Sequence, residues 1–285
     1  MNERRWAQLL AIIRIEIRKT FFARRGLWIY LLALAPVGIF LLHAIIERHL
    51  RATRPGTRTT TIEQAAFIFA HVFQFFFVRL AVFFGCLGIF MNLFRGEMLD
   101  KSLHYYLLAP VKREIVLSGK FVAGLIAASV VFASSALLQQ AALFSQFDGS
   151  TLTRYLFENH GLANALVYAG ISVMACVGYG SIFLAAGLLF RNPIFPAALV
   201  LVWEGIDPIL PSTLQKLSVI YYIKSMCPVA TPVQPGMPPL LALLISNVEP
   251  VSGYVAILGL LALSIVIVGV SMARVRKLEI SYSTE

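Results

Sequence analysis

Seven polar side chains inside otherwise apolar stretches are the residues of this sequence that could do chemistry within a membrane. They are His71, Gln74, Arg79, Gln139, Gln140, Glu204 and Asp207. Glu204 and Asp207 are three residues apart, so they share one face of a helix. Polar groups are costly in hydrocarbon and mark substrate pathways, proton relays or ion pairs between helices. We expect Arg79 to pair with Glu204 or Asp207, either as a brace between helices or as part of a substrate path.

Patterns for catalysis, metal binding or nucleotide binding do not accompany these residues. No two of the five histidines form an H-E-x-x-H motif. The Gly119-Lys120 pair is similar to the end of a phosphate-binding loop, but that motif needs Gly five residues earlier and Ser or Thr after the Lys. The sequence has Glu114 and Phe121 there. It therefore predicts no metal, no ATP site and no enzymatic activity of its own.

The composition indicates a membrane protein. Of 285 residues, 59% are hydrophobic and only 13% charged, and the mean hydropathy is +0.79. A soluble domain carries roughly a quarter charged residues, so a soluble fold of this size would lack polar surface. Disorder is excluded because disordered chains are poor in aromatic residues, whereas this chain has 21 Phe. The apolar residues lie in unbroken runs, which favours helices over a β-barrel.

The elements that position the polar residues follow from the length of these runs, since about 20 residues of helix cross a hydrocarbon core about 30 Å thick. The sequence predicts an all-α integral membrane protein with six transmembrane helices, at about 27–46, 66–94, 121–144, 164–190, 194–211 and 250–272. Residues 27–285 are expected to form a single transmembrane domain. The fifth span is short, and Pro208 and Pro211 break its far end. The aromatic run Phe75–Phe77 is expected to face lipid.

The distribution of positive charge predicts the orientation. Sixteen of the 24 Lys and Arg residues lie in the N-terminal tail, the loops after the second and fourth spans and the C-terminal tail. Cytoplasmic loops carry the excess of Lys and Arg, so both termini are expected in the cytoplasm of a multi-pass inner-membrane protein. A basic face beside anionic lipid explains the net charge of +10 without nucleic acid. Four arginines at 48–58 go against this rule.

Three segments outside the spans have patterns of their own. Residues 1–26 are predicted to form a cytoplasmic, interfacial amphipathic helix, whose apolar stripe is Trp6, Leu10, Ile13, Ile17 and Phe21. Residues 95–120 combine mixed charge with exposed Leu and Tyr, which favours a surface for a partner over a passive loop. Within them, a helix is expected to restart at Val111–Lys120. The proline-containing segment 212–249 has apolar pieces too short to cross, which are expected to form re-entrant helices in an outer loop.

With this topology, the chain resembles the permease subunits of type-2 ATP-binding-cassette (ABC) exporters. The similarity is densest at Arg95-Gly96-Glu97, at the Leu107–Arg113 sequence LLAPVKR and at Gly119-Lys120. The tail Arg276–Glu279 is also similar. As a topology the resemblance covers the whole chain, and as a motif it covers about 95–120. The arginine-rich segment 48–58 departs from the family pattern and leaves the substrate class open.

The resemblance implies a transport subunit that pairs with a second permease and is driven by a separate cytoplasmic ABC ATPase, which binds the ATP and Mg²⁺. It implies that the ATPase-coupling residues are Glu97, Leu103, Tyr106, Leu107, Pro110, Val111, Lys112 and Arg113. Flanking them on the interfacial helix would be Arg14, Arg18, Lys19, Arg24 and Arg25. Two alternatives remain: an intramembrane or lipid-processing enzyme that uses Glu204 and Asp207, and a non-catalytic membrane assembly factor.

Overall fold

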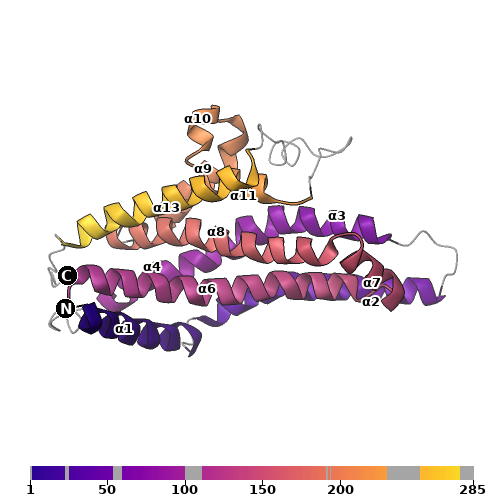
Figure 1. Ribbon diagram of the computed structural model, residues 1–285, viewed down its shortest axis with the longest axis horizontal. Helices are drawn as coiled ribbons and strands as arrows, with labels where there is room; N and C mark the ends of the chain where they lie inside the picture. The colour runs from indigo at the N-terminus through magenta and orange to yellow at the C-terminus, as the bar shows by residue number, and fades with distance from the viewer. Residues whose placement is uncertain are drawn as a thin grey trace.

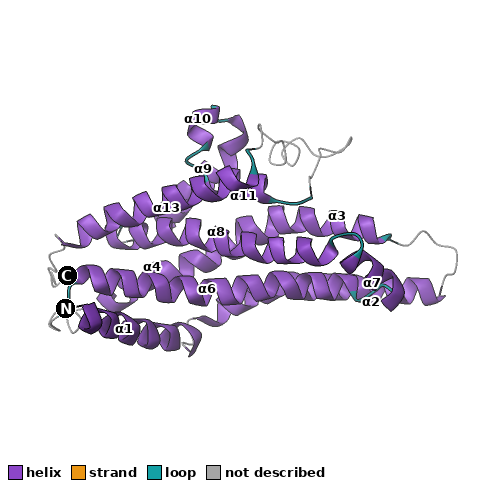
Figure 2. Ribbon diagram, viewed as in Figure 1, coloured by secondary structure: helices purple, strands orange, loops and turns teal. Residues whose placement is uncertain are grey.

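The fold is a bundle of long helices that lie side by side along its long axis (Figure 1). The computed structural model describes residues 2–22, 26–53, 60–99, 111–190, 192, 194–229 and 251–276. Within these residues every regular element is a helix and no strand occurs (Figure 2). The predicted all-α class is therefore confirmed.

The helices follow one another along the chain. Their bounds are α1 Asn2–Phe22, α2 Leu27–Thr53, α3 Ile62–Val72, η2 Phe73–Val82, α4 Phe83–Leu99, α6 Arg113–Phe144, α7 Gly149–Phe157, α8 Gly161–Leu189, α9 Ile194–Ile206, η3 Asp207–Ile209, α10 Ser212–Gln215, α11 Val219–Met226 and α13 Gly253–Arg276. The beginning of α1, the beginning of α6 and the end of α13 lie at one end of the bundle (Figure 1). We call this end the base.

Five helical stretches among the described residues are long and apolar enough to cross a membrane. They are Leu27–Thr53, Ile62–Leu93, Arg113–Phe144, Gly161–Leu189 and Gly253–Arg276. These coincide with the first four predicted spans and with the last one. Many of their outward-facing side chains are apolar, as on α2, where Leu31 and Leu42 are exposed. This composition is that of a membrane protein, because a soluble bundle covers itself with polar residues.

The fifth predicted span, 194–211, is not among these five stretches of the described residues. Its helix, α9, has only 13 residues, which at 1.5 Å per residue extend about 20 Å and fall short of a hydrocarbon core. It gives way at Asp207 to the 3₁₀ turn η3, where Pro208 cannot continue an α-helix. The chain then turns through α10, which stands out from the bundle, and returns as α11 (Figure 1).

The core lies where α6 and α8 pack against each other and against α1, α2, α4 and α13. Glycines allow aromatic rings to approach the helix backbones. The Phe132 ring lies against Gly85, and the Phe90 ring lies against Gly180. An aromatic row formed by Phe69, Phe73 and Tyr168 joins α3 and η2 to α8, with ring centroids 4.8 to 5.7 Å apart. These contacts fix the second predicted span against the fourth.

The second predicted span contains an irregularity that hydropathy does not reveal. Between α3 and α4 the helix continues as a ten-residue π-helix, η2, which includes Arg79. π-Helical segments are rare and frequently occur at functional sites. Within η2, Phe77 is fully buried, Phe75 is partly buried and Phe76 is exposed. The prediction that the Phe75–Phe77 run faces lipid is therefore wrong at Phe77, and it stays a prediction for the exposed Phe76.

Two of the unexpected arginines at 48–58 have structural partners at the end of the bundle opposite the base. Arg48 donates to the main-chain oxygen of Ser145, directly after α6. Arg51 donates to the main-chain oxygen of Gln146 at 3.1 Å and lies over the Phe147 ring. Carbonyls at the C-terminus of a helix lack intrahelical donors and favour cations. Arg48 and Arg51 thus cap α6 from α2.

The N-terminal helix forms, but its buried face differs from the predicted stripe. Trp6 and Leu10 are exposed, at 63% and 62%, whereas Ile12 and Glu16 are buried. Ile13 and Ile17 are partly buried beside them. Trp6 and Leu10 of the predicted stripe lie on the exposed side of α1, because α1 docks on α6 through the neighbouring face. Arg14, Arg18 and Lys19 remain exposed on α1.

Candidate functional site

A cleft of about 280 Å³ lies between η2 and α9, the elements that carry Arg79 and Glu204. Its wall is formed by Phe75, Arg79, Leu80, Phe83, Tyr179, Leu201, Glu204 and Gly205. Most of these side chains are apolar, and three carry polar groups. Beside Gly205 the cleft is open, because a Cβ atom there would meet no atom within 4 Å. The second and fifth predicted spans thus form one pocket.

The expected contact between Arg79 and the 204–207 region exists, although it is not made to a carboxylate. Arg79 Nη1 donates to the main-chain oxygen of Glu204 at 3.1 Å. The guanidinium also lies over the Phe75 ring, 5.8 Å from its centroid. A cation over an aromatic face is stabilised by the ring quadrupole. Arg79 therefore joins η2 to α9 through the backbone.

The Glu204 carboxylate instead binds the first residues of α11. It accepts hydrogen bonds from Ser218 Oγ, the Val219 amide and the Ile220 amide, each at 2.9 Å. The first amides of a helix lack intrahelical partners, and an anion there is favoured by the helix dipole. Glu204 is 3% exposed, so these bonds also compensate for burial of its charge.

Asp207 and Lys224 complete the group of charged residues around the turn after α9. Asp207 is 2% exposed, and among the described residues no hydrogen-bond donor reaches its Oδ1. Burial, followed by the nearby Arg79, lowers the pKa of Lys224 to about 8, against the opposing effect of Asp207 and Glu204. Gln215 closes the turn by donating to the main-chain oxygens of Asp207 and Leu210.

The other predicted intramembrane polar residues lie away from the cleft wall. Gln139 donates to Ser135 Oγ at 3.0 Å, and Ser135 donates to the Ala33 oxygen of α2. Gln74 and Gln140 are buried. His71 Nδ1 lies 3.0 Å from the main-chain oxygen of Phe67, within the same helix. For Gln139 these contacts favour the interpretation as a brace between helices.

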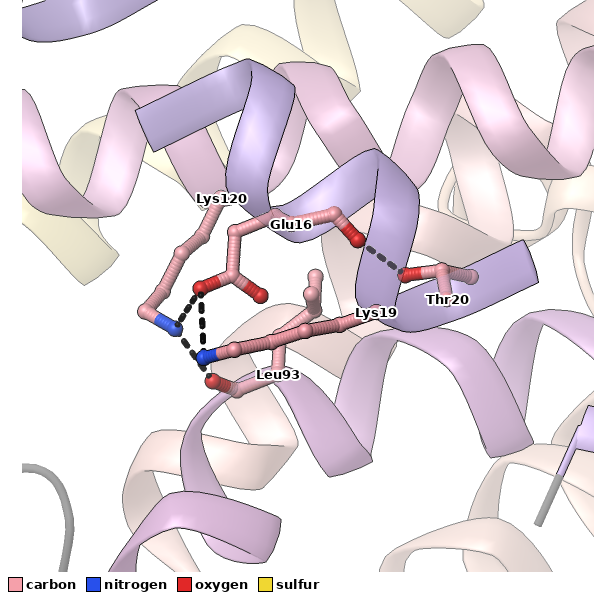
Figure 3. Close-up of polar contacts among 5 residues, drawn as sticks. All are labelled: Glu16, Lys19, Thr20, Leu93 and Lys120. Carbon is pink, nitrogen blue, oxygen red and sulfur yellow. Dashed lines mark hydrogen bonds and ion pairs between the residues drawn. The ribbon is translucent and has the colours of Figure 1, made fainter. Parts of the chain in front are cut away.

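A second polar site lies at the base, where α1 meets α6 (Figure 3). Lys120 Nζ lies 2.8 Å from Glu16 Oε1 and donates to the main-chain oxygen of Leu93 at 2.9 Å. Lys120 is fully buried and Glu16 is 3% exposed. Lys19 lies 3.7 Å from the same carboxylate oxygen. One buried ammonium group thus joins α1, α4 and α6.

The residue before Lys120 explains how α1 comes so close. A Cβ atom at Gly119 would lie 2.8 Å from Ile12 Cγ2, which is closer than side chains pack, so only glycine fits beneath Ile12. Gly119 and Lys120, a pair noted in two sequence patterns, therefore form the surface of α6 on which α1 packs. Val111 and Lys112 precede α6, and its first residue, Arg113, donates to the Arg276 oxygen of α13.

Several coupling residues implied by the resemblance cannot be placed. Glu97 belongs to the helical backbone of α4, and its side chain lies outside the described residues. The remaining ones outside the described residues are Arg24, Arg25, Leu103, Tyr106, Leu107 and Pro110. Their roles stay predictions.

Sequence reasoning missed four contributors to these sites. They are Glu16, Tyr179, Ser218 and Lys224. Glu16 lies outside the predicted apolar stripe of α1, and its partner is 104 residues away. A glutamate within a buried helix face is the signal that could have identified it, but the sequence does not show which face of α1 docks on α6.

Comparison of the chain with protein-family models, characterised proteins and solved structures gave no match.

Proposed function

We propose that the chain is the permease subunit of an ATP-driven exporter of the type-2 ABC class, situated in the inner membrane with both termini in the cytoplasm. Two such permeases pair. In each, α9 with its following turn adds a sixth membrane element to the five long helices, and α1 lies in the membrane interface. A separate ATPase binds the segment 95–113 and supplies the energy. Its ATP-driven motion moves the helices that carry this segment.

The observation that carries the proposal is the packing around Lys120. The segment 95–113 begins within the last residues of α4 and ends at the first residue of α6. Lys120 ties those two helices to α1 through Leu93 and Glu16. Glu114 at the start of α6 also pairs with Arg276 at the end of α13. A force applied to the segment would therefore act on α1, α4, α6 and α13 together. Such a rigid base is what a motor outside the membrane requires.

The cleft between η2 and α9 supports a transport path rather than a closed brace. It combines an apolar wall with Arg79 and Glu204 at the depth of a predicted span. Small-molecule sites have this composition, mostly apolar with a few polar groups. We propose that the cleft forms part of the path that opens when two permeases move relative to each other.

The enzyme alternative receives less support. An acid-base catalyst needs a carboxyl group that can reach its substrate, whereas the Glu204 carboxylate is occupied by three bonds to α11. Glu204 thus has a positioning role within the bundle.

Affinity purification of the full chain from native membranes tests the proposal. We expect a protein with a phosphate-binding loop, G-x-x-x-x-G-K-[ST], to be recovered in stoichiometric amount and identified by mass spectrometry. Glu97→Lys should abolish its recovery, whereas Glu158→Gln, at an exposed glutamate directly after α7, should not. Recovery of no such ATPase with the wild-type chain would contradict the proposal.

A further inference from the structure

The short helix α11 depends on contacts from outside itself. It has eight residues, and an isolated helix of that length is not stable in water. Its first amides are bound by the Glu204 carboxylate through Val219 and Ile220. Without this acceptor, two buried amides and the Ser218 hydroxyl would lose their partner.

Close contacts with two glycines of neighbouring helices fix the position in which α11 packs. A Cβ atom at Gly178 of α8 would lie 2.8 Å from Val219 Cγ1, and one at Gly259 of α13 would lie 2.5 Å from the Tyr222 ring. Val219 and Tyr222 are buried. Because the two glycines accept α11 at its beginning and in its middle, a small displacement of its start disturbs both contacts.

The position of Glu204 is in turn fixed from η2. Arg79 holds the Glu204 main-chain oxygen at 3.1 Å, and Arg79 belongs to the π-helical part of the second predicted span. A π-helix and an α-helix direct the same side chain at different angles around the axis, because their hydrogen-bond registers differ. A change of η2 toward α-helix would therefore move Arg79 and release the Glu204 backbone.

We propose that Arg79 and Glu204 form a linkage by which the π-helical segment η2 holds α11 against Gly178 and Gly259. Arg79 and Glu204 both act as positioning residues. Arg79 fixes the backbone of Glu204, and the Glu204 carboxylate completes the start of α11. When η2 changes register, α11 leaves Gly178 and Gly259. The linkage rests on packing within one chain, so it holds whether or not an ATPase binds.

The chain contains its own probe for this movement. Cys227 directly follows α11, is partly buried and donates to the Ile223 oxygen at 3.4 Å. The other two cysteines, Cys86 and Cys176, are fully buried. In lipid nanodiscs, a membrane-impermeant maleimide should label wild-type Cys227 slowly and Cys227→Ser not at all. Glu204→Ala should raise the labelling rate by about tenfold, since losing a charged acceptor at a helix start lowers the helix population by about that factor.

Matched variants separate the linkage from general loosening. Glu158→Gln, at an exposed glutamate, should label like wild type. Gly259→Val, which pushes on Tyr222, should label faster and shows the response to a displaced α11. Arg79→Met should label several-fold faster, and Arg79→Met/Glu204→Ala should label no faster than Glu204→Ala alone, because both act on one linkage.

Hydrogen exchange of the Val219 and Ile220 amides gives a second reading that needs no thiol. Both amides should lose protection in Glu204→Ala. In Glu204→Gln, whose side chain keeps a single acceptor oxygen, at least one of them should. Unchanged labelling and unchanged exchange in the Glu204 variant would overturn the proposal. It would also be overturned if the effects of Arg79→Met and Glu204→Ala multiplied in the double variant, since independent effects exclude a linkage.

Discussion

Replacing Lys120 by Met tests whether α1 is fixed to the bundle by a buried ion pair. The substitution keeps most of the length of the side chain and removes its charge. It leaves Glu16, which is 3% exposed, without its 2.8 Å partner. Removing one member of a buried pair costs about 3–5 kcal/mol, because the other charge stays buried. Lys19 still lies 3.7 Å from Glu16 Oε1, so we expect a loss of about 3 kcal/mol, near the lower limit of that range.

The free energy of unfolding of each variant can be measured by SDS titration in mixed micelles, and limited trypsin digestion follows α1 separately. Arg14 and Arg18 are exposed but helical, so cleavage after them requires α1 to open. Lys120→Met should speed this cleavage, by roughly a hundredfold for 3 kcal/mol. Lys19→Met is the matched control: Lys19 is half exposed, and exposed pairs contribute at most about 1 kcal/mol.

The double variant Glu16→Leu/Lys120→Met sharpens the test. Replacing both members of a buried pair by apolar residues is often neutral, so this variant should recover most of the stability that Lys120→Met loses. The reasoning is refuted if Lys120→Met costs no more than Lys19→Met. It is equally refuted if the double variant is no more stable than Lys120→Met.

Three further predictions, each with a matched comparison, use the same unfolding measurement. Gly205→Ala should raise the free energy of unfolding by about 0.5–1 kcal/mol, because Ala is the better helix former and a Cβ atom at Gly205 meets no atom within 4 Å. Gly178→Ala should lower the free energy of unfolding, because a Cβ atom there would lie 2.8 Å from Val219. Arg51→Ala should cost about 1–3 kcal/mol through the loss of its bonds to the Gln146 and Thr60 oxygens, while Arg154→Ala, at an exposed arginine, should cost less than about 0.5 kcal/mol. The pKa of Lys224 in the folded protein is about 8, below its ordinary value of 10.5. Between these two pH values unfolding takes up a proton, so the free energy of unfolding should rise with pH by at most about 1.4 kcal/mol per pH unit. Lys224→Met should remove this slope.

The membrane helices could be predicted because hydropathy alone determines them. The runs at 121–144 and 164–190 end within a few residues of α6 and α8, since the length of an apolar run is set by the membrane. The fifth run was predicted too long. Asp207 and Pro208 lie inside it, and they end α9 after 13 residues.

The sites were harder to predict, because their contacts join distant segments. The pair of acids at 204 and 207 was correctly brought near Arg79, yet no sequence pattern indicates that Arg79 reaches a backbone oxygen rather than a carboxylate. The groups that the Glu204 carboxylate binds depend on the turn that brings α11 back to the bundle. Tertiary packing sets the conformation of that turn. Likewise, the π-helix that carries Arg79 has no sequence signature in this chain.

ATP turnover by the purified full chain with its associated proteins tests the central claim most directly. We predict vanadate-sensitive hydrolysis in nanodiscs that disappears when Glu97→Lys is purified in the same way, with Glu158→Gln retaining it. Wild-type preparations without ATP turnover, or turnover that is identical in the Glu97→Lys preparation, would contradict the claim that a separate motor drives this protein from its base.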